Sequence, residues 1–248
     1  MPISPDATPV IRPVKTRNTP KLGPVAMMAA TTLDFQLLKS HLEFEDQDCR
    51  HLYTAGLVVG SGRSNGMSLC GPFIGAPYAA MILETLIVWG AARIVFMGWC
   101  GAISKDVHIG DIIVPNGALV DEGTSLHYMQ KGMDIVQPSN LILGKTRQVL
   151  KVDRVTHHEG MVWTIDAAFR ETREAVESFQ EKGILAVEME LSALLSVGMF
   201  HGVDVSGLLV VSDELSSLTW KPGFKNEKFK QARKTAALIV MKLCEVLT

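Results

Sequence analysis

The sequence lacks the features that mark membrane-spanning, secreted and nucleic-acid-binding chains. Its 248 residues carry a formal net charge of only −2, so no strong field of one sign favours nucleic acid or an anionic membrane. The amino-terminal segment has no apolar stretch of the kind that directs secretion, and charge or glycine interrupts the longer apolar runs. We therefore expect a cytoplasmic protein without a membrane-spanning segment or a nucleic-acid partner.

Cysteine is scarce and unsuitably spaced for a structural site. The four cysteines are Cys49, Cys70, Cys100 and Cys244, and none of them forms a CxxC pair. Their spacing predicts neither a zinc site nor a disulfide framework, and reduced thiols are the simpler interpretation. We expect no metal and no cofactor.

The sequence does have the composition of a globular protein. Hydrophobic residues make up 47% of it and charged residues 20%, which suffices for one large core. Five prolines fall in the first 20 residues and exclude a regular helix or a central strand there. We interpret residues 1–23 as an extended, proline-rich arm, either laid on a neighbouring subunit or partly disordered, and residues 24–248 as one domain.

Strand and helix patterns alternate after this arm. Short apolar runs predict strands, and apolar residues every three or four positions predict helices. Strands are expected at 24–29, 53–59, 67–71, 93–97, 111–115 with 118–120, 154–158, 184–187 and 205–211. Helices are expected at 33–42, 76–89, 141–150, 166–182 (with Asp166 as its N-cap), 189–201 and 226–247. This order predicts an α/β fold, a three-layer αβα sandwich with a mixed central sheet.

The glycine-rich segment 60–66 has some likeness to a phosphate-binding loop. However, its spacing is GxGxxxG and no helix follows it directly. A β-hairpin turn between the strands at 53–59 and 67–71 is the better interpretation.

Carboxylates stand where two apolar strands end. Glu188 and Glu190 lie at the junction between a strand and the next helix, and Asp213 follows Ser212 at the end of another strand. A tight glycine turn is expected at 98–101, where a third strand ends. Ligands of α/β sheets bind beyond the carboxyl ends of strands. Helix capping explains either carboxylate position alone, but carboxylates at neighbouring strand ends together indicate acid–base chemistry.

Four stretches of the sequence, in order, resemble the nucleoside phosphorylase-I superfamily of purine nucleoside phosphorylases, uridine phosphorylases and related nucleosidases. They are IGAPYA at 74–79 against IGGPS, GWCGAI at 98–103 with IGDIIVP at 109–115 against GxxGA and VGDIVVP, EGTSLHY at 122–128 against DGxSLHF of uridine phosphorylases, and AVEME at 186–190 with VSD at 211–213 against EME and SD. The resemblance extends from about residue 24 to the carboxyl terminus. It implies a phosphorylase-like fold with a partly barrel-like sheet, and a homo-oligomer, either a dimer or a trimer of dimers.

The resemblance also implies cleavage of an N-ribosidic bond through a transition state similar to a ribosyl oxocarbenium ion. Glu190 would hold the ribose 2′- and 3′-hydroxyls and stabilise the developing positive charge, with Met189 packed against the sugar. Asp213 would protonate or hydrogen-bond purine N7, which requires a raised pKa. The other side chains implied at the ribose and the base are those of Glu188, Trp163, Thr164 and Ser212.

The resemblance favours a purine-type nucleoside as the small-molecule partner. Uridine phosphorylases usually lack an acid at the position of Asp213, and their Gln–Arg pair for uracil has no clear counterpart near residues 169–173. Trp163 lies where family members line the base pocket. It therefore either stacks on a base or is a core side chain.

The phosphate site that the family uses is incomplete here. The family usually supplies three arginines, one of them from a neighbouring subunit, and a hydroxyl in the glycine turn. Asp34 and Phe96 stand at two of the arginine positions, and Trp99, beside Gly98, stands at the hydroxyl position. Only Arg50 matches the third arginine, and it is equally well explained as a surface charge. Asp34 in place of an arginine reverses the local charge, and a like-charge contact at about 4 Å costs on the order of 4 kcal/mol.

Three interpretations of the reaction are therefore open. Hydrolysis is favoured, with Asp34 as a general base for water. Phosphorolysis would need a rearranged phosphate site that uses Arg50 and Arg63. A third interpretation is a protein without catalytic activity that binds a nucleoside as a sensor or scaffold.

Overall fold

The computed structural model describes residues 9–130 and 132–248, and within these ranges one sheet of eleven strands runs through the molecule. The strands are β1 (Val25–Ala29), β2 (Cys49–Leu52), β3 (Ala55–Val59), β4 (Met67–Gly71), β5 (Arg93–Ala102), β6 (Ile112–Asp121), β7 (Ile135–Val136), β8 (His158–Ile165), β9 (Ala186–Glu188), β10 (Asp204–Glu214) and β11 (Lys221–Pro222). The α-helices are α1 (Thr32–Lys39), α2 (Ala76–Trp89), α3 (Asn140–Val152), α4 (Arg173–Glu181), α5 (Leu191–His201) and α6 (Glu227–Leu247). None of the helices described here combines the length and the apolar content that crossing a membrane requires.

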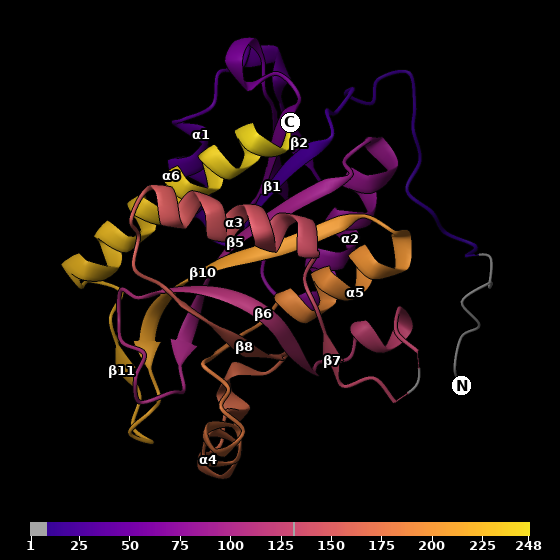
Figure 1. Ribbon diagram of the computed structural model, residues 1–248. Helices are drawn as coiled ribbons and strands as arrows, with labels where there is room; N and C mark the ends of the chain where they lie inside the picture. The colour runs from indigo at the N-terminus through magenta and orange to yellow at the C-terminus, as the bar shows by residue number, and fades with distance from the viewer. Residues whose placement is uncertain (1–8, 131) are drawn as a thin grey trace.

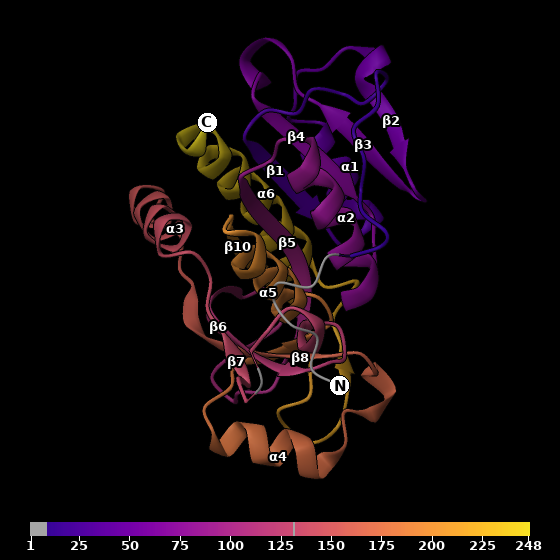
Figure 2. The same cartoon turned by 90° about the vertical axis from the view of Figure 1, so that its right-hand side faces the viewer.

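Five strands of the sheet pair into a closed ring, and Figure 1 labels β5, β6, β8 and β10 among them. β5 pairs with β10 and β9, β10 pairs with β6, β6 pairs with β8, and β8 pairs with β9, so each has two neighbours within the ring. The strands β1, β4, β3 and β2 continue from β5 as an open extension, at the top of Figure 2. Parallel and antiparallel pairings both occur, which confirms the predicted mixed, partly barrel-like sheet.

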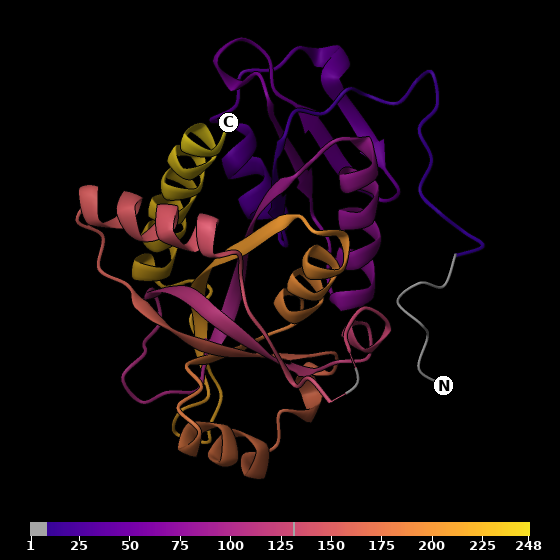
Figure 3. The same ribbon diagram turned by 45° about the vertical axis from the view of Figure 1, so that its right-hand side comes forward.

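Helices cover both faces of the sheet, because successive side chains of a strand point to opposite faces and both faces are buried. Along β5, Phe96 and Cys100 belong to the core formed with α2 and α5, whereas Met97 and Trp99 pack into the core formed with α1, α3 and α6. Figure 3 shows α3 and α6 on one side of the sheet and α2 and α5 on the other. The three predicted layers are therefore confirmed.

The predicted hairpin at segment 60–66 is also confirmed. β3 and β4 pair antiparallel, and a 3₁₀ turn at Gly62–Ser64 lies between them. Gly62 and Gly66 have φ angles of 54° and 90°, which side chains with a Cβ rarely adopt. These two glycines are therefore required by the geometry of the turn.

The prediction of a tight turn at 98–101 is wrong, because β5 continues through this segment to Ala102. A Cβ on Gly98 would lie 2.5 Å from the Phe96 ring, and a Cβ on Gly101 would lie 2.5 Å from the Leu215 side chain. Glycine inside a strand often marks such a close approach. The two glycines make room for neighbouring side chains and leave the strand unbroken.

Two predicted elements after α3 are misplaced. The strand expected at 154–158 lies at His158–Ile165, because Arg154 adopts a left-handed φ of 55° in the turn that ends α3. The helix expected from residue 166 begins at Arg173, where the Thr172 hydroxyl accepts a hydrogen bond from the Ala175 N–H at 3.3 Å. Asp166, the predicted cap, instead accepts from the Gly123 N–H at 3.0 Å. A contact 43 residues away in the sequence thus replaces a local cap.

Residues 9–23 contain neither helix nor strand. The Trp89 indole N–H donates to the Val14 carbonyl at 3.1 Å, and the Arg50 guanidinium donates to the Asn18 carbonyl at 2.8 Å. These contacts lay the described part of the proline-rich segment against its own chain. Residues 1–8 of the predicted arm lie outside the described residues, and an arm contact with a neighbouring subunit stays a prediction.

Candidate functional site

The two strand ends that carry the predicted carboxylates lie on either side of β5. Asp213 of β10 is paired with Gly101, and Val187 of β9 is paired with the same glycine from the other side. A Cβ on Gly101 would lie 3.1 Å from Asp213 Oδ2 and 3.4 Å from Val187 Cγ1. Burial, and then the charges of Asp213 and Glu188, raise the pKa of the adjacent Cys100 thiol. The fold thus gathers both strand-end carboxylates around one point of β5.

Glu188 is engaged by the protein itself. Its Oε2 accepts from the Glu190 N–H at 2.8 Å and from the Leu191 N–H at 2.7 Å, and its Oε1 accepts from the Thr164 hydroxyl. The carboxylate thereby caps the amino terminus of α5, where unpaired N–H groups and the helix dipole favour negative charge. Burial raises the pKa of Glu188, although these donors favour its charged form. These contacts correspond to the helix-capping interpretation and indicate a structural part for Glu188.

Glu190 points away from its own helix. Its backbone occupies the N-cap of α5, but its side chain makes no capping bond there. Instead Oε1 accepts from the Gly75 N–H, at the start of α2, at 2.7 Å. Burial, and then the negative charge of Glu188, raise the pKa of Glu190, whose residue is only 5% exposed. A buried carboxylate of this kind gains from further hydroxyl donors such as those of a sugar.

We expect Glu190→Gln to stabilise the free protein at alkaline pH. Because the folded-state pKa of Glu190 is raised above that of the unfolded chain, the folded protein binds more protons between these two values. The free energy of unfolding must then fall as pH rises through this window, by about 1.4 kcal/mol per unit of pKa shift. Glutamine keeps an acceptor for the Gly75 N–H and removes the titration.

Urea unfolding at about pH 5 and about pH 9 measures this difference. The wild type should lose stability relative to Glu190→Gln between the two conditions. Equal pH dependence in the two proteins would contradict the burial of an ionisable carboxyl at this position.

Asp213 accepts hydrogen bonds from two side chains. Ser212 Oγ donates to Oδ1 at 2.6 Å, and the Trp220 indole N–H donates to Oδ2 at 2.9 Å. Glu171 lies in the segment before α4; burial, and then the charge of Asp213, raise the pKa of its carboxyl to about 7. Neither Trp220 nor Glu171 belongs to a recognised motif. Only the folding of two loops toward β10 brings them to Asp213.

Asp34 of α1 is fully buried between Trp99 of β5 and Arg233 of α6. Its Oδ1 accepts from Arg233 Nε at 2.7 Å and lies 2.6 Å from Arg233 Nη2, and its Oδ2 accepts from Trp99 Nε1 at 2.5 Å. The Arg233 guanidinium also lies 5.2 Å from the centroid of the Trp99 ring. Burial raises the pKa of Asp34, and the charge of Arg233 opposes that shift. An arginine from α6 therefore compensates the reversed charge at Asp34, although no sequence motif indicates this pairing.

The residues assigned to a phosphate or water pocket are not brought together. Phe96 is fully buried and packs against Phe73 with ring centroids 6.0 Å apart, in the core with α2 and α5. Gly98 lies against the Phe96 ring. Trp99 packs into the opposite core. Two faces of one strand separate the aromatic side chains that the sequence places in one pocket.

The arginines considered for phosphate also have other partners. Arg50 donates to the Asn18 carbonyl, as described above. Arg63 pairs with Glu43 at 2.6 Å and its side chain is almost fully exposed. Neither contact includes a residue at the ends of β9 or β10.

Trp163 has the contacts of a core side chain. It is 1% exposed, its ring packs against Phe179 with centroids 4.5 Å apart, and its indole N–H donates to Asp121 Oδ2 at 2.9 Å. Of the two interpretations left open by the sequence, these contacts favour the core. Met189 is half-buried between the two glutamates and retains surface that a sugar could cover.

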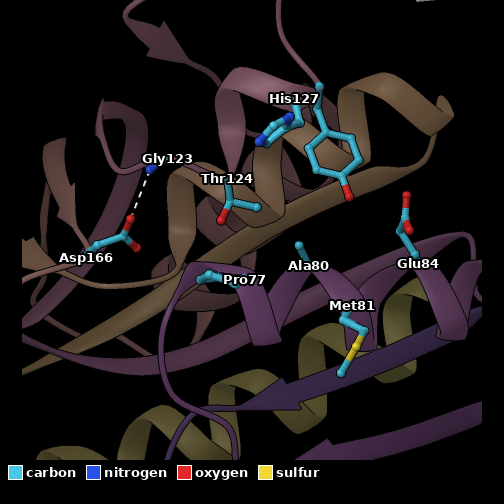
Figure 4. A pocket seen from close by; sticks show the side chains of 9 residues that line it. Pro77, Ala80, Met81, Glu84, Gly123, Thr124, His127 and Asp166 are labelled. Carbon is cyan, nitrogen blue, oxygen red and sulfur yellow. Dashed lines mark hydrogen bonds between the residues drawn. The ribbon is translucent and has the colours of Figure 1, made fainter. Parts of the chain in front are cut away.

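A pocket of about 580 Å³ lies between the first turns of α2 and segment 123–128. Figure 4 shows the Glu84 and Asp166 carboxylates at its two ends, with Thr124 and His127 on the wall between them. Pro77, on the α2 side, follows by two residues the glycine whose N–H binds Glu190. The pocket thus opens close to the start of α2, where the Glu190 carboxylate is held.

The chain is similar to known proteins in both sequence and structure. The family model described as "Phosphorylase superfamily" matches residues 24–245. A DeoD-type purine nucleoside phosphorylase of Bacillus cereus (strain ZK / E33L) is 30% identical over 159 residues, which cover 63% of this chain and 67% of that protein. Uridine phosphorylase from Vibrio fischeri ES114 has a TM-score of 0.76 and 22% identity over 90% of this chain and 92% of its own. 5′-Methylthioadenosine/S-adenosylhomocysteine nucleosidase from Helicobacter pylori has a TM-score of 0.74 and 17% identity over 90% of this chain and 97% of its own.

Proposed function

The chain belongs to the phosphorylase superfamily, and from that premise we propose that it cleaves the N-ribosidic bond of a purine-type nucleoside with water as the acceptor. The observation that carries the proposal is the placement of carboxylates at the ends of β9 and β10, on either side of Gly101 of β5. The relatives include a purine nucleoside phosphorylase and a nucleosidase, so both water and phosphate are precedented acceptors.

One carboxylate acts on the sugar of the substrate and the other acts on its base. Glu190 accepts hydrogen bonds from the ribose hydroxyls, and its charge favours the cationic transition state over the neutral substrate. The bond between C1′ and the base nitrogen breaks with its electron pair going to the base. Asp213, oriented by Ser212 and Trp220, delivers a proton to purine N7, so the base leaves neutral. A water oxygen then bonds to C1′ and gives up one of its two protons to the solvent, from which Asp213 is reprotonated, so that the products are free base and ribose.

The arginines support water as the acceptor. In the described part of the chain, Arg50 holds a backbone carbonyl, Arg63 pairs with an exposed glutamate, and Arg233 pairs with Asp34. The family that the sequence resembles usually binds the phosphate dianion with three arginines, and these contacts engage the arginines elsewhere. Asp34 stays our sequence-based candidate for activating water, but its contacts with Arg233 and Trp99 favour a structural pairing.

We expect base release that does not depend on phosphate. The protein is incubated with adenosine, inosine and guanosine, with and without inorganic phosphate, and free base, ribose and ribose 1-phosphate are separated by chromatography. Free base and ribose should form in a 1:1 ratio, and the same amounts should form with and without phosphate. Formation of ribose 1-phosphate would overturn water as the acceptor and favour a rearranged phosphate site. Nucleoside binding without turnover would favour a binding protein, and absence of both would contradict the site.

A further inference from the structure

A chain of buried hydrogen bonds joins Glu122, directly after β6, to Glu188 at the end of β9. The Ser192 hydroxyl donates to Glu122 Oε1 at 2.9 Å, and the Ser192 N–H donates to Thr164 Oγ1 at 3.0 Å. The Thr164 hydroxyl then donates to Glu188 Oε1. All four residues are buried, and Glu122 is only 6% exposed. The chain ends at the carboxylate whose other oxygen accepts from the Glu190 N–H.

Glu122 also holds one wall of the pocket whose lining residues Figure 4 shows. Its Oε2 accepts from the Thr124 N–H at 2.6 Å, and both of its oxygens lie 3.1 Å from the Ser125 nitrogen. The Ser125 hydroxyl accepts in turn from Ser196 of α5 at 2.9 Å. One buried carboxylate therefore ties segment 123–128 to the first turns of α5.

This arrangement gathers three carboxyl groups in a buried place. In the described residues, the donors to Glu122, Glu188 and Glu190 are backbone N–H groups and hydroxyls. The charge of Glu122 acts on Glu188, and that of Glu188 acts on Glu190. Burying carboxylates without a cation destabilises the folded protein. Apolar residues of similar volume at these positions would leave the protein no less stable. The network is therefore better explained by the position and charge that it imposes than by stability.

We propose that Glu122 is a positioning residue for Glu190, acting through Ser192, Thr164 and Glu188. It determines where the Glu190 carboxylate stands at the start of α2 and how much charge that carboxylate carries. The assignment rests on the function proposed above, in which Glu190 binds the ribose. Outer hydrogen-bond partners of this kind orient the groups that touch a ligand.

A single substitution at Thr164 can interrupt the chain of hydrogen bonds between Glu122 and Glu188. Its hydroxyl accepts from the Ser192 N–H and donates to Glu188, and an aliphatic side chain of similar volume can do neither. Thr164→Val breaks both bonds and keeps the volume, whereas Thr164→Ser keeps both bonds. Thr146 of α3 provides a matched control, because it is also buried and its hydroxyl donates only to the Ile142 carbonyl of its own helix.

The first test measures the carboxyls of the free protein and needs no nucleoside. Protein with ¹³C-labelled glutamate side chains is titrated by NMR, and the Glu188 and Glu190 signals are assigned by their loss in Gln variants. Glu122→Gln should lower the midpoints of this pair, because one nearby negative charge is removed. Thr164→Val should raise them, because Glu188 loses a donor to its charged form; Thr164→Ser and Thr146→Val should leave them unchanged. Cys100 and Asp213, the other titratable groups nearby, are not altered. Unchanged midpoints in both Glu122→Gln and Thr164→Val would overturn the proposal.

The second test measures base release. Thr164→Val should lower kcat/KM for adenosine by about 10- to 100-fold, since small displacements of a positioned group have effects of that size. Thr164→Ser should restore the wild-type value, and Thr146→Val should retain it. Wild-type kcat/KM in Thr164→Val would contradict positioning through this link. Absence of base release from the wild type would refute the proposed function, and the titration would still decide whether the network sets the Glu188–Glu190 pair.

Discussion

Asp213→Asn should lower the rate of base release by about 10²- to 10⁴-fold without unfolding the protein. An amide cannot supply the proton that a departing purine requires. The substitution suits the local structure: the amide oxygen can accept from the Trp220 indole, and the amide nitrogen can donate to the Ser212 hydroxyl. The substitution should therefore lower the rate of bond cleavage much more than the stability of the protein. Steady-state kinetics with adenosine, together with thermal unfolding, separates the two.

A matched control exists in the same fold. Asp121 also accepts from an indole N–H, that of Trp163, at the same distance of 2.9 Å. Asp121→Asn should leave base release within about twofold of wild type, since substitutions of surface residues outside the proposed site usually have small effects.

A substrate whose leaving group needs no proton provides the sharper discrimination. A ribofuranoside with a nitrophenolate leaving group should be cleaved by Asp213→Asn at close to the wild-type rate. If the variant is equally impaired with this substrate, Asp213 does not act as the acid. A loss below tenfold with adenosine would contradict the same role.

Arg233→Met should destabilise the protein by about 3–5 kcal/mol, because it leaves the Asp34 carboxylate buried without its cation. Asp34 is fully buried, and the Arg233 side chain is 12% exposed, so water screens this pair little. Methionine retains an apolar side chain beside the Trp99 and Phe229 rings over which the guanidinium lies. The cost should therefore come from charge more than from lost packing. Urea unfolding near neutral pH measures it.

The double variant Asp34→Asn with Arg233→Met should recover most of that stability, because no buried charge remains. The loss in Arg233→Met should also shrink at acidic pH, where Asp34 takes up a proton. Arg147→Met is the control: Arg147 pairs with Glu159 at 2.5 Å, but its side chain is 52% exposed, so the cost should be at most about 1 kcal/mol. If Arg233→Met lowers the free energy of unfolding no more than this control does, the buried charge of Asp34 does not explain the effect.

Asp34→Asn by itself tests the interpretation of Asp34 as a base. If Asp34 activates water, base release should fall by at least about 100-fold, the lower end of the effects usual for acid–base groups. Base release that remains unchanged would show that the residue serves the ion pair with Arg233. The contacts with Arg233 and Trp99 favour this second outcome.

The sequence by itself determined the order of the helices and longer strands and the hairpin, whereas the short strands β2, β7 and β11 were not predicted. The range of α2 follows from a long apolar run between Gly75 and Gly90, both with positive φ. These features depend on neighbouring residues, whose periodicity and backbone freedom can be read directly from the chain. The strand ends that carry Glu190 and Asp213 were predictable for the same reason, since each follows an apolar run.

The tertiary structure alone decided which side chains meet. Asp34 and Arg233 are 199 residues apart, and the Ser192 hydroxyl reaches Glu122 across 70 residues. Glycines at 98 and 101, which in the sequence predict a turn, let β5 run on because Phe96 and Leu215 fill the space beside them. The ends of β9 and β10, which carry the carboxylates, lie on either side of Gly101 because both strands pair with it. Strand register and the choice of sheet face set all of these contacts, and both arise only when the closed sheet forms.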